Sequence, residues 1–182
     1  MKPFAAIIGA ISLIISLTAC SSLTPQQKAA KKAEEARRDS IAFTEAAKAI
    51  ASGDFVLEGN YLSGRTGRRM YVTSSTNFIS VRGGQAVLQV SPANGGGPNG
   101  VGGISLSGQV TDASIKHLDN GGLQFRANVN GNALSANIIL SLIPGTDRAS
   151  ATVMPNFNSL NMTLEGKIVP ASQSTIFQGR TF

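Results

Sequence analysis

The chain has 182 residues, a formal net charge of +6, one cysteine, one histidine and no tryptophan. This length suits one folded domain and not comfortably two. Residues 53–182 carry nine basic and six acidic side chains, scattered along the sequence. A nucleic-acid footprint needs a concentrated basic stripe, so the composition predicts no nucleic-acid partner.

Residues 1–19 have the pattern of a lipoprotein signal peptide. Lys2 provides a positive charge, an apolar run follows up to Leu17, and Leu-Thr-Ala-Cys ending at Cys20 has the form of a bacterial lipobox. The apolar run is shorter than the roughly 20 residues that a transmembrane helix needs. We therefore expect the chain to be cleaved before Cys20 and Cys20 to be acylated by fatty acids such as palmitate. Acylation would attach the protein to a membrane and would leave no thiol for a disulfide.

After a short lipidated tether at residues 20–24, residues 25–52 have the composition of a helical spacer. Thr24 is a suitable N-cap, Pro25 suits the first helical position, and Gly53 stands where a glycine ends many helices. The first half is polar all round. The second half carries an apolar stripe at helical spacing that could dock on a domain: Phe43, Ala46, Ala47 and Ile50.

Residues 53–182 form the predicted β-domain, in which apolar and polar residues alternate. Nine segments show this pattern or strand composition: 55–62, 69–72, 78–81, 85–90, 104–110, 123–129, 134–142, 149–153 and 160–168. Turns rich in glycine and asparagine separate them. The pattern predicts an all-β antiparallel meander of about eight or nine strands, closing into a barrel or a two-layer sandwich. Small inward residues such as Gly108 indicate tight curvature or a thin interior.

Three arginines surround a tight turn early in this domain: Arg65, Arg68 and Arg69. Forked guanidinium donors and turn amides can hold a phosphate or a carboxylate. The bland alternative is a solvated loop that keeps a sheet edge soluble. The three arginines are therefore candidate ligand-binding residues.

Asn99 is a further candidate, because it lies in the longest loop, residues 92–103. Long loops carry function more often than strands do, so this loop is either a lid over the mouth of the domain or an ordinary connection. Residues 95–100 also match a dinucleotide-binding motif in their letters. Pro98 interrupts that turn and a strand pattern, not a helix, follows it, so we reject the motif.

Catalysis and metal binding find little support in the sequence. His117 is the only histidine, and Asp112 would lie on the opposite face of an extended strand. The nearest pair of acids in sequence, Asp54 and Glu58, would share a strand face that we expect to be exposed to solvent. We therefore predict no catalytic residues, no metal and no cofactor. Sugar-binding proteins usually expose tryptophan, which this chain lacks; Tyr61 is one of its two tyrosines.

Several blocks of the sequence, in order, resemble one known family: residues 55–61, 67–81, 96–103, 155–159 and 177–180. The chain resembles domain-of-unknown-function family 4251, small lipoproteins of gut Gram-negative anaerobes, over roughly residues 35–182. The resemblance implies an all-β exported domain behind a lipid anchor, and it supplies no functional residues. In lipoproteins of that group, surface display goes with an acidic cluster after the cysteine. Residues 21–26 lack one, which implies an outer-membrane protein that faces the periplasm.

Three functions follow as expectations. The leading one is a non-enzymatic lipoprotein whose β-domain binds a small apolar or amphipathic ligand or an envelope protein. The second is a structural or assembly role in the envelope, with a sheet edge or the loop 92–103 as the docking surface. The third and least favoured is a hydrolase, which would need a cleft with paired acids.

Overall fold

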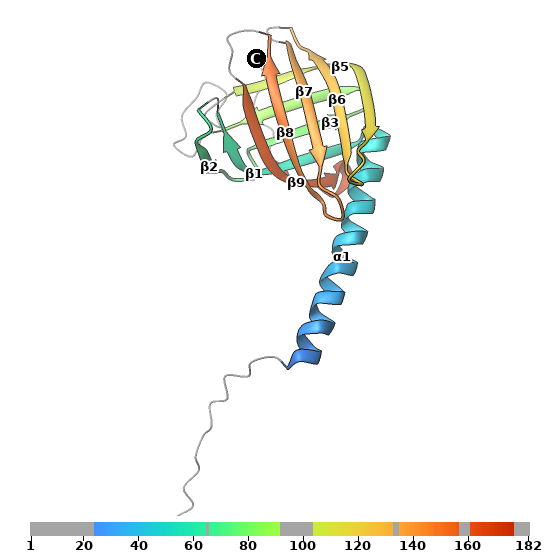
Figure 1. Ribbon diagram of the computed structural model, residues 1–182. Helices are drawn as coiled ribbons and strands as arrows, with labels where there is room; N and C mark the ends of the chain where they lie inside the picture. Colours follow the sequence, from blue (N-terminus) through green and yellow to red (C-terminus); the bar gives the residue numbers. More distant parts are fainter. Residues whose placement is uncertain (1–23, 65, 92–103, 133–134, 157–160, 177–182) are drawn as a thin grey trace, which may run out of the picture.

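The computed structural model describes residues 24–64, 66–91, 104–132, 135–156 and 161–176. Cys20, Arg65 and Asn99 lie outside the described residues. The described elements, labelled in Figure 1, are α1 (Pro25–Ser52), β1 (Phe55–Ser63), β2 (Arg69–Tyr71), β3 (Phe78–Arg82), β4 (Gln85–Val90), β5 (Ile104–His117), β6 (Leu123–Asn130), β7 (Ser135–Leu142), β8 (Arg148–Pro155), β9 (Met162–Pro170) and the short 3-10 helix η1 (Ala171–Gln173).

Both ends of α1 are capped by side chains or backbone that the sequence supplies locally. The Gln27 amide donates to the Thr24 hydroxyl at 3.3 Å, and the Gln27 side chain accepts from the Thr24 amide at 2.9 Å. This reciprocal pair satisfies two donors that a helix start would otherwise leave unpaired. Gly53 ends the helix in a left-handed conformation, with φ +66°, where a side chain would be strained. Among the described helices, none combines the length and apolar character needed to cross a membrane.

The last turns of α1 pack against the barrel through the predicted apolar stripe. Ala46, Ala49 and Ile50 are buried and belong to the main core cluster, with Phe43 and Ala47 packed against it. The helix contacts β1 and β9 here. Figure 1 shows that the rest of α1, in blue, projects away from the barrel. The stripe prediction is therefore confirmed.

Eight of the nine strands form a closed antiparallel barrel. Neighbouring strands pair in the order β1, β3, β4, β5, β6, β7, β8 and β9, and β9 pairs back to β1. The prediction of an all-β meander is confirmed, and of its two alternatives the structure is the barrel. The ninth strand, β2, lies outside the closed circuit. It pairs with Tyr61–Ser63, the second part of β1. β3 pairs with Phe55–Glu58, the first part of the same strand, so β2 and β3 follow one another along one edge of β1.

Alternate residues of the barrel strands point inward and are buried. In β7, for example, Ala136, Ile138, Leu140 and Leu142 are buried, and their neighbours are half-buried. The interior is one continuous apolar cluster, in which the rings of Phe55 and Phe125 meet edge to face at 5.3 Å. Eight strands give an interior that side chains can just fill.

The curvature requires small residues where strands approach closely. A Cβ on Gly108 would lie 2.5 Å from the backbone of Asn130, and one on Gly166 would lie 1.9 Å from the Glu58 carbonyl oxygen. No side chain fits at such distances, so these positions admit only glycine unless the strands separate. The structure thus requires a small residue at Gly108, the position for which the sequence predicts tight curvature or a thin interior.

β5 is longer than its sequence pattern predicts, because it contains a bulge. Its pairing with β6 shifts between Thr111 and Ser114, and Asp112 has a positive φ of 51°. The extra residue interrupts the alternation on which the prediction depended, and the strand continues to His117.

A buried polar side chain ties the turn before β3 to the end of β4. Asn77 is fully buried, and its amide nitrogen donates to the Thr73 carbonyl at 2.9 Å and to the Thr76 hydroxyl at 3.2 Å. Its side-chain oxygen accepts from the Ser91 amide at 2.7 Å. The Asn77 side chain therefore adds three hydrogen bonds to the backbone bond from the Thr76 amide to the Thr73 carbonyl that closes the turn.

Candidate binding groove

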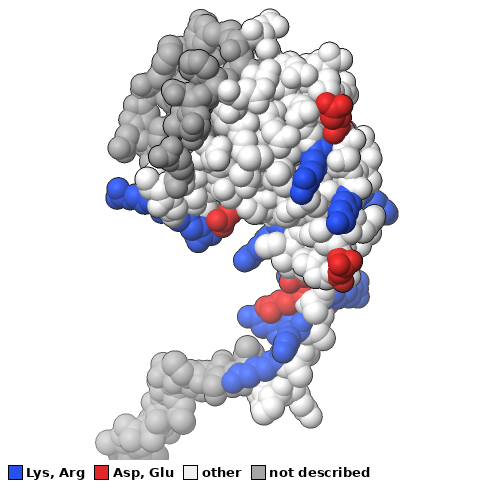
Figure 2. Space-filling view, turned by 45° about the horizontal axis from the view of Figure 1, so that its top comes forward, with Lys and Arg blue, Asp and Glu red and all other residues white. Residues whose placement is uncertain are grey.

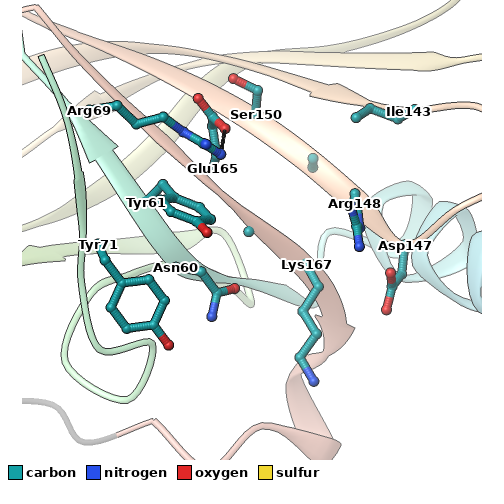
Figure 3. A pocket seen from close by; sticks show the side chains of 12 residues that line it. Asn60, Tyr61, Arg69, Tyr71, Ile143, Asp147, Arg148, Ser150, Glu165 and Lys167 are labelled. Atoms are coloured by element: carbon teal, nitrogen blue, oxygen red, sulfur yellow. Dashed lines mark hydrogen bonds and ion pairs between the residues drawn. The ribbon is translucent and has the colours of Figure 1, made fainter.

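A groove of about 600 Å³ lies on the outer wall of the barrel, beside the point where β1 and β9 close it. Figure 3 shows the side chains that line it, which come from β1, β2, the turn between β7 and β8, β8 and β9. The lining residues are Asn60, Tyr61, Arg69, Tyr71, Ile143, Asp147, Arg148, Ala149, Ser150, Glu165, Gly166 and Lys167. Its volume falls in the range of about 300–1,000 Å³ that is typical of small-ligand sites.

Strand register places the groove side chains in rows across the sheet. One row runs across β2, β1, β9 and β8 through directly opposed residues: Tyr71, Tyr61, Glu165 and Ser150. The neighbouring row, across β1, β9 and β8, is Glu58, Lys167 and Arg148. The β1–β9 pairing shifts between Gly59 and Tyr61, so Asn60 is an extra residue between the two rows. Such a bulge bends the strand and redirects the side chains around it.

The end of the groove near β2 is an aromatic platform, made of Tyr61, Tyr71 and Arg69. The two tyrosine rings meet edge to face at 5.5 Å and 82°. The Arg69 guanidinium carbon lies 3.6 Å from the centre of the Tyr61 ring, and its Nη2 bonds the Glu165 carboxylate at 2.6 Å. Stacking and the charged hydrogen bond fix these three groups relative to one another. Tyr71 is 67% exposed, so part of its ring is open to solvent.

The opposite end of the groove carries two basic side chains, Lys167 and Arg148, and the acid Asp147. Lys167 and Arg148 are directly opposed on neighbouring strands, and like charges in that position repel. The Lys167 Nζ lies 4.0 Å from the Glu58 carboxylate, at the limit of an ion pair. Among the described residues, the Arg148 guanidinium has no ion pair or hydrogen bond. Figure 3 shows Arg148 beside Asp147, well away from the two tyrosines.

The arginine turn is only partly assembled into this site. Arg69 lines the groove, with its charge engaged by Glu165. Arg68 is exposed and does not line it. Arg65 and Asn99 lie outside the described residues, so their predicted roles stay predictions, as does lipidation of Cys20.

Five groove residues are not predicted from the sequence: Tyr61, Tyr71, Arg148, Glu165 and Lys167. Alternation alone predicts that these positions face outward. It does not predict that β1 and β9 pair, because that contact joins the two ends of the domain. The two tyrosines were noted for their rarity, and that was the available signal.

The acids singled out in the sequence do not form a paired site. The expectation that Glu58 faces open solvent is wrong: its side chain is 14% exposed, because the segment after β9 lies over it. The Ser174 hydroxyl donates to Glu58 Oε1 at 2.7 Å, whereas Asp54 is exposed. In the described part of the chain, no three His, Cys, Asp or Glu side chains gather as metal ligands.

Charged side chains outside the groove are distributed differently on the barrel and on α1. Figure 2 shows a face of the barrel with few charged side chains, and basic and acidic side chains interleaved along α1. Four of the side chains on α1 form two ion pairs between residues one turn apart, Lys31 with Glu35 and Arg38 with Glu34. Exposed pairs of this kind are typical of a solvated helix.

Comparison with known proteins places the chain in a structural context. A family model described as domain of unknown function DUF4251 matches residues 37–168. A crystal structure of a DUF4251 family protein from Bacteroides eggerthii is similar, with 37% sequence identity and a TM-score of 0.69, over 81% of this chain and 99% of that one. No curated protein matches the chain.

Proposed function

This chain belongs to the DUF4251 family of domains of unknown function, and we propose that it acts as a non-enzymatic binding module of the bacterial cell envelope. In this proposal the barrel is a scaffold, and the groove between β2 and the β7–β8 turn holds the ligand or partner. Acylated Cys20 anchors the protein to the outer membrane, with the barrel facing the periplasm.

The contrast between the inside and the outside of the barrel carries this proposal. The inward residues are buried apolar side chains in one cluster. The groove instead combines an exposed aromatic ring, hydrogen-bonding side chains and cations. Sites that recognise ligands combine apolar surface with a few placed polar groups, so the outer wall supports binding better than the interior does.

The helix suits a spacer in this arrangement. Residues 25–41 of α1 are exposed. Most of them are polar or alanine, and Ile41, which is 49% exposed, is the one large apolar side chain among them. Seventeen helical residues at about 1.5 Å each span about 25 Å. A lipid at Cys20 would therefore hold the barrel clear of the membrane surface.

The acids of the groove support binding rather than hydrolysis. Asp147 and Glu165 both line it, but Glu165 is engaged by Arg69 at 2.6 Å. Figure 3 shows Asp147 at the other end of the groove. A pair of carboxylates flanking one bond is the arrangement that glycoside hydrolysis needs, and this separation does not supply it.

An assembly role is the second candidate, and β2 favours it. All three residues of β2 are exposed, and within the described residues the strand pairs with β1 alone. Met70 is 40% exposed and Tyr71 67%. A partner strand that added to this edge would place an envelope protein beside the groove.

Site-specific photo-cross-linking in intact host cells tests the binding role. A photoreactive phenylalanine replaces Tyr71, and the matched control replaces Ile115, which is 40% exposed on β5. We expect one dominant adduct from position 71 and none from position 115. No adduct at position 71, or equal adducts at both, would contradict the proposal; an adduct with the mass of a protein would favour assembly.

A further inference from the structure

We infer that the groove binds an acidic saccharide, with a sugar ring on the Tyr71 platform and a carboxylate between Lys167 and Arg148. This inference rests on the proposed binding role of the groove and adds the chemistry of its ligand. Three features of the groove carry it: a charge imbalance, an aromatic face and a set of unengaged hydrogen-bonding groups.

The charge imbalance lies at the end of the groove formed by β8 and β9. The groove lining carries three basic side chains, Arg69, Arg148 and Lys167, and two acidic ones, Asp147 and Glu165. Lys167 and Arg148 are directly opposed on two paired strands. The Glu58 carboxylate, 4.0 Å from Lys167, already accepts from Ser174, and Asp147, which Figure 3 shows beside Arg148, forms no ion pair with another described residue. A carboxylate placed between the two cations would offset their repulsion, and guanidinium groups bind carboxylates with two parallel hydrogen bonds. The charges therefore favour an anionic group at this end.

The aromatic platform fits the flat face of a ring. One face of Tyr61 is covered by the Arg69 guanidinium at 3.6 Å, and its ring meets the Tyr71 ring in an edge-to-face contact at 5.5 Å. The Tyr71 ring, 67% exposed, is therefore the open surface of a supported stack. Tyrosine offers apolar area at small entropic cost, together with a hydroxyl at its end.

Three further hydrogen-bonding side chains line the groove. Asn60, Ser150 and Asp147 line the groove, and their side-chain polar atoms have no bond to another described residue. Amides, hydroxyls and a carboxylate suit a ligand that carries many hydroxyl groups.

A peptide fits this floor less well. The strands that form it, β1, β8 and β9, are paired on both edges. A bound peptide could therefore not add to them as a strand, which is the usual source of affinity for extended peptides. Recognition in the groove has to come from side chains, as it does for a sugar.

Calorimetric titration of the full chain, purified in detergent, tests the inference. The probes are trisaccharides of galacturonate, of mannuronate and of hyaluronan type, each compared with a neutral trisaccharide of matched linkage. We expect at least one acidic member to bind at least about tenfold more tightly than its neutral counterpart. This preference should shrink as salt rises, because exposed charges are screened.

Variants of groove residues test which side chains cause the preference for acidic over neutral trisaccharides. The double variant Arg148→Gln/Lys167→Gln should reduce the acidic preference to about twofold or less, whereas Tyr71→Ala should weaken acidic and neutral binding alike. Arg126→Gln is the matched control, because Arg126 is an exposed strand arginine with Gln124 as its bonding partner. Circular dichroism would verify that each variant is folded.

Four results would overturn the inference: no binding by any acidic member, equal binding of neutral members, a preference that survives the double variant, or equal binding of triglutamate. Cross-linking at Tyr71 separates this failure from that of the proposed function. An adduct in cells without an acidic preference overturns the ligand class alone, whereas the absence of both overturns the binding role too.

Discussion

Replacement of Gly166 by alanine is expected to destabilise the barrel strongly, because Gly166 lies where β9 crosses closest to β1. An alanine Cβ would lie 1.9 Å from the Glu58 carbonyl oxygen, 2.7 Å from its carbonyl carbon and 2.8 Å from Gly59 Cα. All three neighbours are backbone atoms of the strand that closes the barrel. Relief therefore requires the two strands to separate, which breaks the closing ladder.

The size of the effect follows from what must move. Overpacking a core by one methyl group costs typically about 1–3 kcal/mol when side chains can adjust. Here the contact is with backbone, so we expect a loss of about 3 kcal/mol or more in the free energy of unfolding. For a domain of this size, one kcal/mol shifts Tm by about 2–4 °C. The variant should therefore melt about 6–12 °C below the wild type or fail to fold.

Two further glycines provide graded controls. At Gly59 the added Cβ would meet Leu164 side-chain atoms at 2.4–2.9 Å, and these can rotate away, so Gly59→Ala should cost about 1–3 kcal/mol. At Gly64 nothing lies within 4 Å, and Gly64→Ala should stay within about 0.5 kcal/mol. Urea unfolding of the three variants gives the order directly. A Gly166→Ala variant as stable as Gly64→Ala would refute the β1–β9 closure.

Three other variants test separate parts of the structure. Ile50→Ala should lower the free energy of unfolding by about 2–4 kcal/mol, because Ile50 is 1% exposed in the core cluster. The control Ile41→Ala, at a position that is 49% exposed, should change the free energy of unfolding by less than about 0.5 kcal/mol. Equal effects of the two variants would contradict the docking of α1. Asn77→Ala should cost about 2–3 kcal/mol in urea unfolding, since it removes bonds to Thr73, Thr76 and Ser91 inside the fold; a neutral result would mean that water replaces them. Cys20→Ala should abolish labelling by an alkyne analogue of palmitate and move the protein from the membrane fraction to the soluble fraction, and undiminished labelling would disprove the predicted anchor.

The sequence predicts local structure well because its signals are local. Alternation or strand composition indicates each barrel strand, and Phe43, Ala46 and Ile50 indicate which face of the helix docks. The choice between a barrel and a sandwich was left open, since it depends on one long-range pairing, Phe55 with Pro170 and onward. The end of β5 was predicted too early, because the bulge at Asp112 breaks the alternation.

The groove was predicted poorly for the same reason. Arg69 was a candidate, but Arg68, its neighbour in sequence, does not line the groove. Its contacts are Tyr61 and Glu165, and the second of these lies on the last strand. The groove residues are brought together by the register of β2, β1, β9 and β8. They can therefore be predicted only when the pairing of those strands is known. Likewise, the cover over Glu58 comes from Ser174, after the last strand.

Amide chemical-shift mapping tests most directly the claim that the outer wall, and not the interior, holds the ligand. The isotope-labelled full chain in detergent would be titrated with the acidic trisaccharide that calorimetry selects, or with the whole panel at millimolar concentration. The account predicts the largest shifts at Asn60, Tyr71, Arg148 and Lys167, with Phe125 in the core unchanged. Shifts centred on interior residues such as Phe125, or no shifts with any probe, would contradict it.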